Sequence, residues 1–191
     1  MAPDGSDLRQ VTSGLYDHRE PAWSPDGRMI AFSSDRSGNG SYDIWTIDLA
    51  TGAYERRTSM TTEEHSPAWS PDGTRIAYCD GRFVFAVDAA GQREMLASAP
   101  SGTVQAPAWF PNGQGVAYQN NNRQIVLGTQ VVTSGEDVFP FPVRWLPDGR
   151  FLYTGDGKVR FRNSDAAAIR TDIAFSAAPE DQSSGGAIKG S

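Results

Sequence analysis

Pro21-Ala22-Trp23-Ser24-Pro25-Asp26-Gly27 returns unchanged as Pro67-Ala68-Trp69-Ser70-Pro71-Asp72-Gly73. Two altered copies follow, Pro107-Ala108-Trp109-Phe110-Pro111-Asn112-Gly113 and Trp145-Leu146-Pro147-Asp148-Gly149. The four tryptophans are 46, 40 and 36 residues apart in turn. A segment that recurs at such intervals indicates an array of repeats, each of which is one supersecondary unit.

Each copy is followed by the same pattern of short apolar runs. The first run after each Pro-Asp-Gly turn is Met29 to Phe32, Ile76 to Tyr78, Val116 to Tyr118 or Phe151 to Tyr153. Alternating runs rich in β-branched and aromatic residues come next, as in Asp43-Ile44-Trp45-Thr46-Ile47, and this alternation is the strand signal. A unit of four short strands and roughly 40–45 residues is typical of a β-propeller blade. We therefore predict an all-β fold, a β-propeller with about four four-stranded blades.

The repeat also predicts the domain boundaries. The propeller should span 1–175, with a partial blade at 1–15 and a tail or linker at 176–191, which is rich in Gly, Ser and Ala. The blades should cover roughly 16–60, 61–101, 102–136 and 137–175. Residues 8–12 match the final strand of a blade, and Ile169 to Phe175 match a fourth strand of the last blade. One strand is then left over, so we favour a segment of a larger ring.

The conserved chemistry of the repeat has a structural interpretation. A large flat indole is suited to packing between adjacent sheets, so we expect Trp23, Trp69, Trp109 and Trp145 to lie in the inter-blade core. Asp and Asn bond their own following backbone in tight turns. We therefore expect Asp26, Asp72, Asn112 and Asp148 to cap turns rather than to act in catalysis.

Composition excludes several classes of protein. The net charge of −6 argues against nucleic acid as a partner, because phosphates are held by clustered Lys and Arg. No apolar run approaches the ~18 residues that span a bilayer, so we expect no membrane insertion. Cys79 is the one cysteine and lies in an apolar run, so we interpret it as a core residue. The first residues lack the basic start and apolar stretch of a signal peptide.

No catalytic signature is present in the sequence. It contains neither Gly-x-Ser-x-Gly nor His-Glu-x-x-His nor a phosphate-binding Gly-rich loop. Asp35 to Asp43 has the offsets of a calcium loop, but Thr46 replaces the final glutamate, so we favour a solvated loop. We predict no catalytic residue, no metal and no cofactor.

A binding surface can be placed by geometry. In propellers of this type the loop before each innermost strand opens at the channel mouth, and these loops precede the Trp copies. They supply the candidate binding face, which consists of Asp17, His18, Arg19, Glu20, Glu63, Glu64, His65, Gln105, Asp137 and Phe139. The alternative is a set of solvated, structurally bonded loops.

The Trp-Ser-Pro-Asp-Gly copies, together with Ile30-Ala31-Phe32-Ser33-Ser34-Asp35, resemble the WD-like repeats of TolB-type propellers. That resemblance implies a six-bladed ring, a periplasmic or secreted location and a protein partner. Val132 to Phe141 and the segment around Trp145 also resemble the propeller of TolB-containing amidohydrolases, although the His-x-His metal site of those enzymes is not in this sequence.

Two functional hypotheses follow. The first is a non-catalytic scaffold that binds proteins or ligands through its loop face. The alternative is the propeller segment of a larger amidohydrolase or prolyl-oligopeptidase-type peptidase. Open blade edges also predict self-association.

Overall fold

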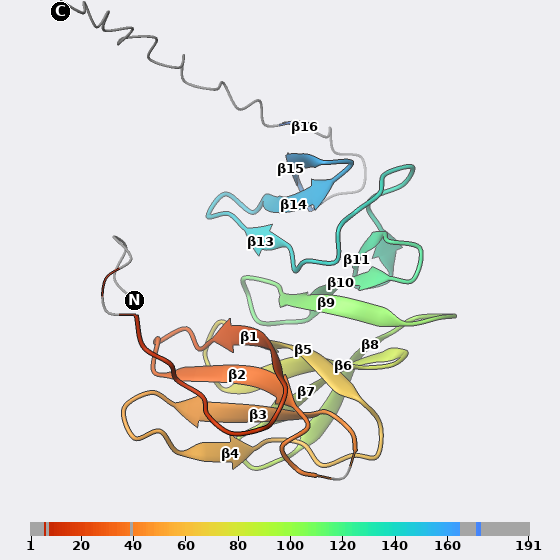
Figure 1. The fold of residues 1–191 in the computed structure, drawn as a ribbon. Coiled ribbons are helices and arrows are strands. Elements are labelled where there is room, and N and C mark those ends of the chain that lie inside the picture. The colour runs from red at the N-terminus through yellow and green to blue at the C-terminus, as the bar shows by residue number, and fades with distance from the viewer. Residues whose placement is uncertain (1–5, 7, 39, 165–170, 173–191) are drawn as a thin grey trace, which may run out of the picture.

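The computed structural model describes residues 6, 8–38, 40–164 and 171–172. Within these residues the secondary structure consists of sixteen β-strands in four antiparallel four-stranded sheets, which Figure 1 shows in succession from the N-terminal to the C-terminal part of the chain. The predicted all-β fold of about four four-stranded blades is thus confirmed. No helix able to cross a membrane is found in this described part of the chain.

The first two sheets, blade 1 and blade 2, have the same strand order as the sequence. Blade 1 contains β1 (His18–Trp23), β2 (Met29–Ser34), β3 (Asp43–Asp48) and β4 (Tyr54–Arg56). Blade 2 contains β5 (Glu64–Trp69), β6 (Arg75–Asp80), β7 (Phe83–Asp88) and β8 (Arg93–Ser98).

Blade 3 and blade 4 follow the same topology with shorter outer strands. Blade 3 contains β9 (Val104–Trp109), β10 (Val116–Asn120), β11 (Ile125–Leu127) and β12 (Gln130–Val131). Blade 4 contains β13 (Arg144–Trp145), β14 (Phe151–Gly155), β15 (Lys158–Arg162) and β16 (Thr171–Asp172).

The Pro-Asp-Gly turn joins the first two strands of each blade. In blade 1 the backbone N–H of Arg28 donates to Oδ1 of Asp26 at 3.1 Å, and the equivalent bonds end on Asp72, Asn112 and Asp148. The glycine that ends the turn has a φ of 70° in Gly27 and 71° in Gly73, a conformation that L side chains rarely adopt. The repeat therefore keeps Gly and a short polar side chain because the turn geometry demands both.

The innermost strands of blades 1, 2 and 3 contain a bulge at the same position. Glu20, Ser66 and Ala106 have φ values of 55°, 55° and 53°, and the ladder shifts register around each of them. A non-glycine residue in this region costs roughly 1–2 kcal/mol. That the cost recurs in three blades indicates that the bulge is part of the repeat.

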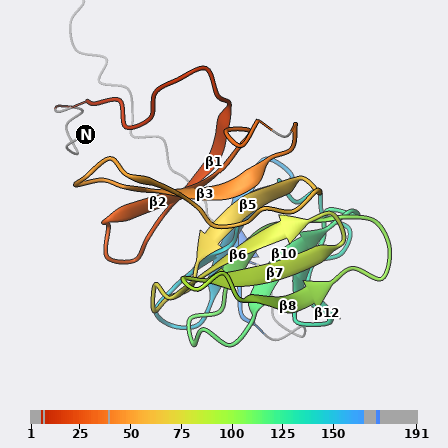
Figure 2. The same ribbon diagram turned by 90° about the horizontal axis from the view of Figure 1, so that it is seen from below.

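The core consists of layers between successive sheets, because side chains alternate between the two faces of each strand. Ile76 and Tyr78 of β6 pack on Ala31 and Ile44 of blade 1. The intervening Ala77 faces the other way. Figure 2 shows blade 2 alongside blade 1, in agreement with the contacts of β5 with β1 and β2.

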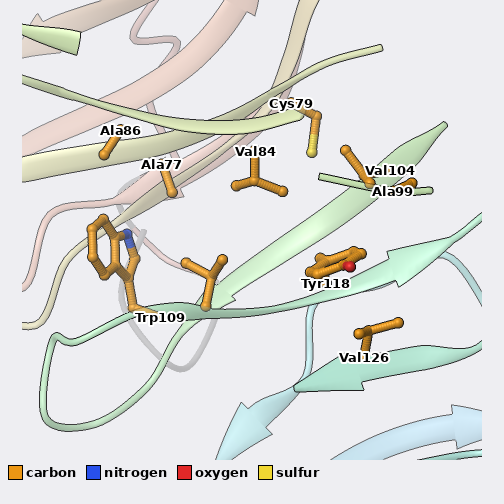
Figure 3. Packing of buried hydrophobic residues seen from close by; sticks show 10 residues of the cluster. Ala77, Cys79, Val84, Ala86, Ala99, Val104, Trp109, Tyr118 and Val126 are labelled. Carbon is orange, nitrogen blue, oxygen red and sulfur yellow. The ribbon is translucent and has the colours of Figure 1, made fainter. Parts of the chain in front are cut away.

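The layer between blades 2 and 3 is the largest. Ala77, Cys79 and Val84 of blade 2 pack on Trp109 and Tyr118 of blade 3, as Figure 3 shows. Burial raises the pKa of the Cys79 thiol well above its usual value. Cys79 is therefore a small core residue that remains a thiol at neutral pH.

The anchor tryptophans fill different environments. Trp109 is 5% exposed and belongs to the core between blades 2 and 3, while Trp69 and Trp145 are partly buried against their neighbouring clusters. The prediction of an inter-blade position was wrong for Trp23, which is 62% exposed. The physical reason is that no sheet packs on the Trp23 side of blade 1 in the described residues.

The ends of the chain differ from the sequence-based expectation. Residues 8–15, expected to include the final strand of a partial blade, form no strand, because no neighbouring strand offers them a ladder of hydrogen bonds. The side chain of Arg9 instead reaches the carbonyl of Leu49 in blade 1 at 3.5 Å. The predicted strand at 169–175 is described only at β16, and the predicted tail at 176–191 lies outside the described residues.

Candidate binding face

The loops that precede the anchors lead into β1, β5 and β9 and, in blade 4, into the segment before β13. The contacts of β1 with β5 and of β5 with β9 place the first three loops side by side, and Gln119 of blade 3 bonds the loop of blade 4 at Val138 and Phe139. We call the residues 16–20, 63–66, 103–105 and 137–141 the loop face. Its candidate residues differ sharply in burial and bonding.

In blade 1, Asp17 is the centre of a polar cluster. Arg19 forms a salt bridge with it at 2.5 Å, and the hydroxyl of Tyr42 donates to its Oδ2 at 2.8 Å. These two bonds, that of Arg19 first, lower the pKa of Asp17. The guanidinium of Arg19 also lies 4.4 Å from the ring centre of Tyr42, so these three side chains hold one another in place.

His18 is part of the structure of blade 1 rather than a free ligand. Its Nδ1 lies 2.8 Å from the hydroxyl oxygen of Ser34, and its ring packs edge-on against Phe32 at 5.0 Å. Burial, followed by the charge of Arg36, lowers the pKa of His18. The imidazole is therefore neutral at neutral pH.

Glu20 connects blade 1 to blade 2. Its carboxylate accepts the backbone N–H of Ser66 at 2.6 Å and the hydroxyl of Ser66 at 3.0 Å. The hydroxyl of Ser33 donates to the same carboxylate at 3.1 Å. The positive φ of Ser66 turns its N–H out of the ladder and toward Glu20, so the bulge and the contact between blades depend on each other.

The prediction that Glu64 lies in a surface loop was wrong. It is the first residue of β5, and its backbone N–H donates to the carbonyl of Tyr42 in blade 1 at 2.9 Å. Its side chain is 0% exposed, so it cannot meet a partner at the surface. The strand β5 already begins at Glu64, inside the segment expected to be a loop before Pro67, and Glu64 is turned inward there.

The residues beside Glu64 stay at the surface. Glu63 is exposed, and Nδ1 of His65 lies 3.1 Å from the hydroxyl oxygen of Ser66. The two histidines thus bond within different blades. The described residues contain no group of three or more His, Cys, Asp or Glu side chains arranged to hold a metal.

Blades 3 and 4 are joined by Gln119, which is 2% exposed. Its amide nitrogen donates to the carbonyls of Val138 and Phe139 at 3.0 and 3.1 Å, while its oxygen accepts from Gln105 at 2.6 Å. Gln105 is therefore part of a bonded chain that fixes the backbone of the loop in blade 4.

The loop of blade 4 is fixed at its backbone and open at its side chains. The N–H of Asp137 donates to Oδ1 of Asp156, and the N–H of Phe139 donates to the carbonyl of Thr154. The side chain of Asp137 forms an exposed salt bridge with Arg123. Phe139 is 39% exposed and Phe141 is 64% exposed, so two aromatic rings face solvent from an ordered loop.

Sequence reasoning missed four residues that build this face, namely Tyr42, Ser66, Gln119 and Phe141. Tyr42, Ser66 and Gln119 act through contacts distant in the chain, for which the repeat gives no signal. Phe141 did have a signal in the sequence, because Phe139-Pro140-Phe141-Pro142 is an apolar run beside a strand start.

Comparisons with known proteins identify the family of this chain. A family model described as TolB beta propeller domain matches residues 1–142. Tol-Pal system protein TolB 1 of Novosphingobium aromaticivorans is 44% identical over 59 residues, which are 31% of this chain and 13% of that protein. Tol-Pal system protein TolB of Rhizorhabdus wittichii is 45% identical over 56 residues, 29% of this chain and 12% of that protein.

Solved structures show the same fold over most of the chain. TolB from Acinetobacter baumannii superposes with a TM-score of 0.67 at 20% identity, covering 89% of this chain and 46% of that one. A putative TolB from Agrobacterium tumefaciens gives a TM-score of 0.67 at 20% identity, covering 84% of this chain and 66% of that one. The chain thus spans about half the length of the first of these structures.

Proposed function

This chain belongs to the TolB β-propeller domain family, and from that premise we propose that it is a non-catalytic scaffold that binds another protein through its loop face. The proposal extends to a periplasmic or secreted location and to a place within a six-bladed ring, both implied by the resemblance of the repeats. The names of the curated relatives, which place them in the Tol-Pal system, support a protein as the partner.

The observation that carries the proposal is the ordered exposure of Phe139 and Phe141. Four hydrogen bonds fix the backbone of the loop that bears Phe139: in two of them loop carbonyls accept from the Gln119 side chain, and in two loop N–H groups donate, to Asp156 and to Thr154. Exposed aromatic rings on a fixed backbone lose little conformational entropy on binding, and aromatic residues are enriched among the side chains that dominate protein interfaces.

The rest of the loop face supports a binding role over a catalytic one. Asp17, Arg19, Glu20 and Gln105 are each held by partners within the protein. Such groups are already engaged within the protein, so they hold the shape of the loop face. We propose that Glu63, His65 and Asp137, whose side chains are exposed or partly exposed, also contact the partner.

The experiment is site-specific photo-crosslinking. A photoreactive phenylalanine analogue replaces Phe139 in the full chain, which is then mixed with an extract of the source organism. A matched control carries the analogue at Met95, which is 57% exposed on β8.

We expect a defined protein adduct from position 139. An excess of the wild-type chain should suppress this adduct, and an excess of the Phe139→Ser/Phe141→Ser chain should not. Absence of an adduct at 139, or the same adducts from both positions, would overturn it.

A further inference from the structure

A group of charged side chains is buried between blades 1 and 2, beneath the loop face. Glu64 and Asp43 are each 0% exposed. Neither carboxylate oxygen of Glu64 has a hydrogen-bond partner. An ionised carboxylate without partners costs several kcal/mol to bury, so the protein must offset this charge.

The arginines near the group are engaged by other carboxylates. Arg56 from β4 contacts the two oxygens of Asp43 at 2.9 and 3.0 Å. Arg93 from β8 forms a salt bridge of 2.5 Å with Asp80, the residue that pairs with Glu64 across β5 and β6. Three carboxylates therefore face two guanidinium groups, and Glu64 is the carboxylate left without a cation.

The remaining neighbours do not supply a charge. Tyr78 of β6 is 0% exposed, and burial, followed by the charge of Glu64, raises the pKa of its hydroxyl. The hydroxyl of Thr58 accepts the backbone N–H of Ile44 at 2.8 Å, and its own proton lowers the pKa of Glu64 without supplying a charge. His65, the next residue on β5, bonds Ser66 on the side of the loop face.

We propose that Glu64 is a proton-binding site that couples pH to the packing of blade 1 against blade 2. The neutral carboxyl group fits this buried position, whereas the ionised group repels Asp43 across the joint and Asp80 within blade 2. The backbone of Glu64 bonds Tyr42, and Ser66 two residues later bonds Glu20. Loss of the proton therefore acts on the two contacts that hold the loops of blades 1 and 2 together.

The direction of the titration agrees with this geometry. Burial raises the pKa of Glu64 to about 7, with a further increase from Asp43, and nearby Thr58 and Arg93 offset only part of this effect. The joint should thus respond to pH within the range that cells and their surroundings experience.

The test is a direct titration of the full chain labelled with ¹³C at glutamate carboxyl carbons, with the resonance of Glu64 assigned by its loss in Glu64→Gln. Hydrogen exchange of the backbone amides of Glu64 and Ser66 is followed over the same range of pH. The matched control is Glu63→Gln, which removes one exposed carboxylate from the neighbouring position.

We expect the Glu64 carboxyl to titrate with a midpoint near pH 7. Over the same pH range, the amides of Glu64 and Ser66 should lose more protection than the intrinsic pH dependence of amide exchange explains. Glu64→Gln should abolish that extra loss, and Glu63→Gln should keep it. A midpoint near 4.5, or an unchanged extra loss in Glu64→Gln, overturns the proposal. If the Gln variant does not fold, the wild-type carboxyl signal, assigned through its neighbours on β5, still decides between the two midpoints.

Discussion

The indole N–H of Trp109 donates a hydrogen bond to the carbonyl of Ala68, 2.9 Å away in the preceding blade. Trp69 makes the equivalent bond to Ala22 at 3.2 Å. In both cases the acceptor is the residue just before the anchor tryptophan of the previous blade. The same repeated tryptophan therefore supplies both the apolar area and the polar contact that join successive sheets.

This relationship predicts unequal costs for the same substitution. Trp109→Ala removes a buried indole and should lower the free energy of unfolding by about 3–5 kcal/mol. Trp23→Ala, at a side chain that is 62% exposed, should lower it by less than about 1 kcal/mol. Urea unfolding followed by circular dichroism, at concentrations where the chain is monomeric, measures both. Equal losses for the two variants would contradict the packing described.

Exposure of Trp23 also bears on self-association, which remains a prediction. The open face of blade 1 presents this indole at the end of β1 without a neighbouring sheet in the described residues, and an exposed apolar side chain of this size favours association. Sedimentation velocity should show a concentration-dependent increase in mass for the wild-type chain and a weaker one for Trp23→Ser. Met95→Ser serves as the control, because Met95 is also exposed but lies on β8. A wild-type chain that stays monomeric at all concentrations would show that the edge does not associate.

The contact between Glu20 and Ser66 should appear as an energetic coupling. Removing the hydroxyl with Ser66→Ala leaves the backbone N–H as a donor, so the double-mutant cycle with Glu20→Ala isolates the hydroxyl bond. We expect a coupling of about 0.5–1 kcal/mol in the free energy of unfolding, since Glu20 is exposed to solvent. Glu63→Ala with Ser66→Ala is the control pair and should be additive. A zero coupling for Glu20 and Ser66 would mean that the hydroxyl bond adds nothing to the contact between the blades.

The raised pKa of Glu64 predicts how the free energy of unfolding depends on pH. Its pKa in the folded chain is about 7, above the ordinary 4.5, so the folded state holds this proton more tightly than the unfolded state does. The contribution of Glu64 to stability is therefore fully present below pH 4.5, declines between 4.5 and 7, and is lost above 7. At pH 8, Glu64→Gln should be more stable than wild type by about 2–3 kcal/mol, and at pH 4 the two should be similar.

Chemical denaturation at a series of pH values measures this difference. Glu63→Gln should follow the wild-type curve, because its side chain is exposed in both states. A Glu64→Gln curve that runs parallel to wild type from pH 4 to pH 8 would show that Glu64 is not responsible.

The sequence was sufficient for the fold because the signals are local and repeated. The turn at Asp26 and Gly27 and the alternation along β3 depend on neighbours in the chain, and their recurrence identifies the blade as the unit. The exposure of Trp23 could not be predicted in the same way. A repeat specifies what each residue would pack against, and the structure alone determines whether that neighbour is there.

The candidate face was predicted less well for a related reason. Its location followed from the repeat, but the inward turn of Glu64 depends on β5 beginning inside the expected loop, where side chains alternate between the two faces of the strand. The partners of Glu20 and Phe139 come from other blades, 46 residues away for Ser66 and 20 for Gln119. Contacts between blades leave no trace in the pattern within one blade.

The most direct test of the proposed function is the affinity of the chain for the protein captured at position 139. Isothermal titration compares wild type, Phe139→Ser/Phe141→Ser and Met95→Ser with that purified protein. Because aromatic side chains at an interface contribute about 1–2 kcal/mol or more each, the double variant should bind at least roughly tenfold more weakly, and Met95→Ser should bind as wild type does. Unchanged binding by the double variant, or an equal loss in Met95→Ser, would contradict a binding role for the loop face.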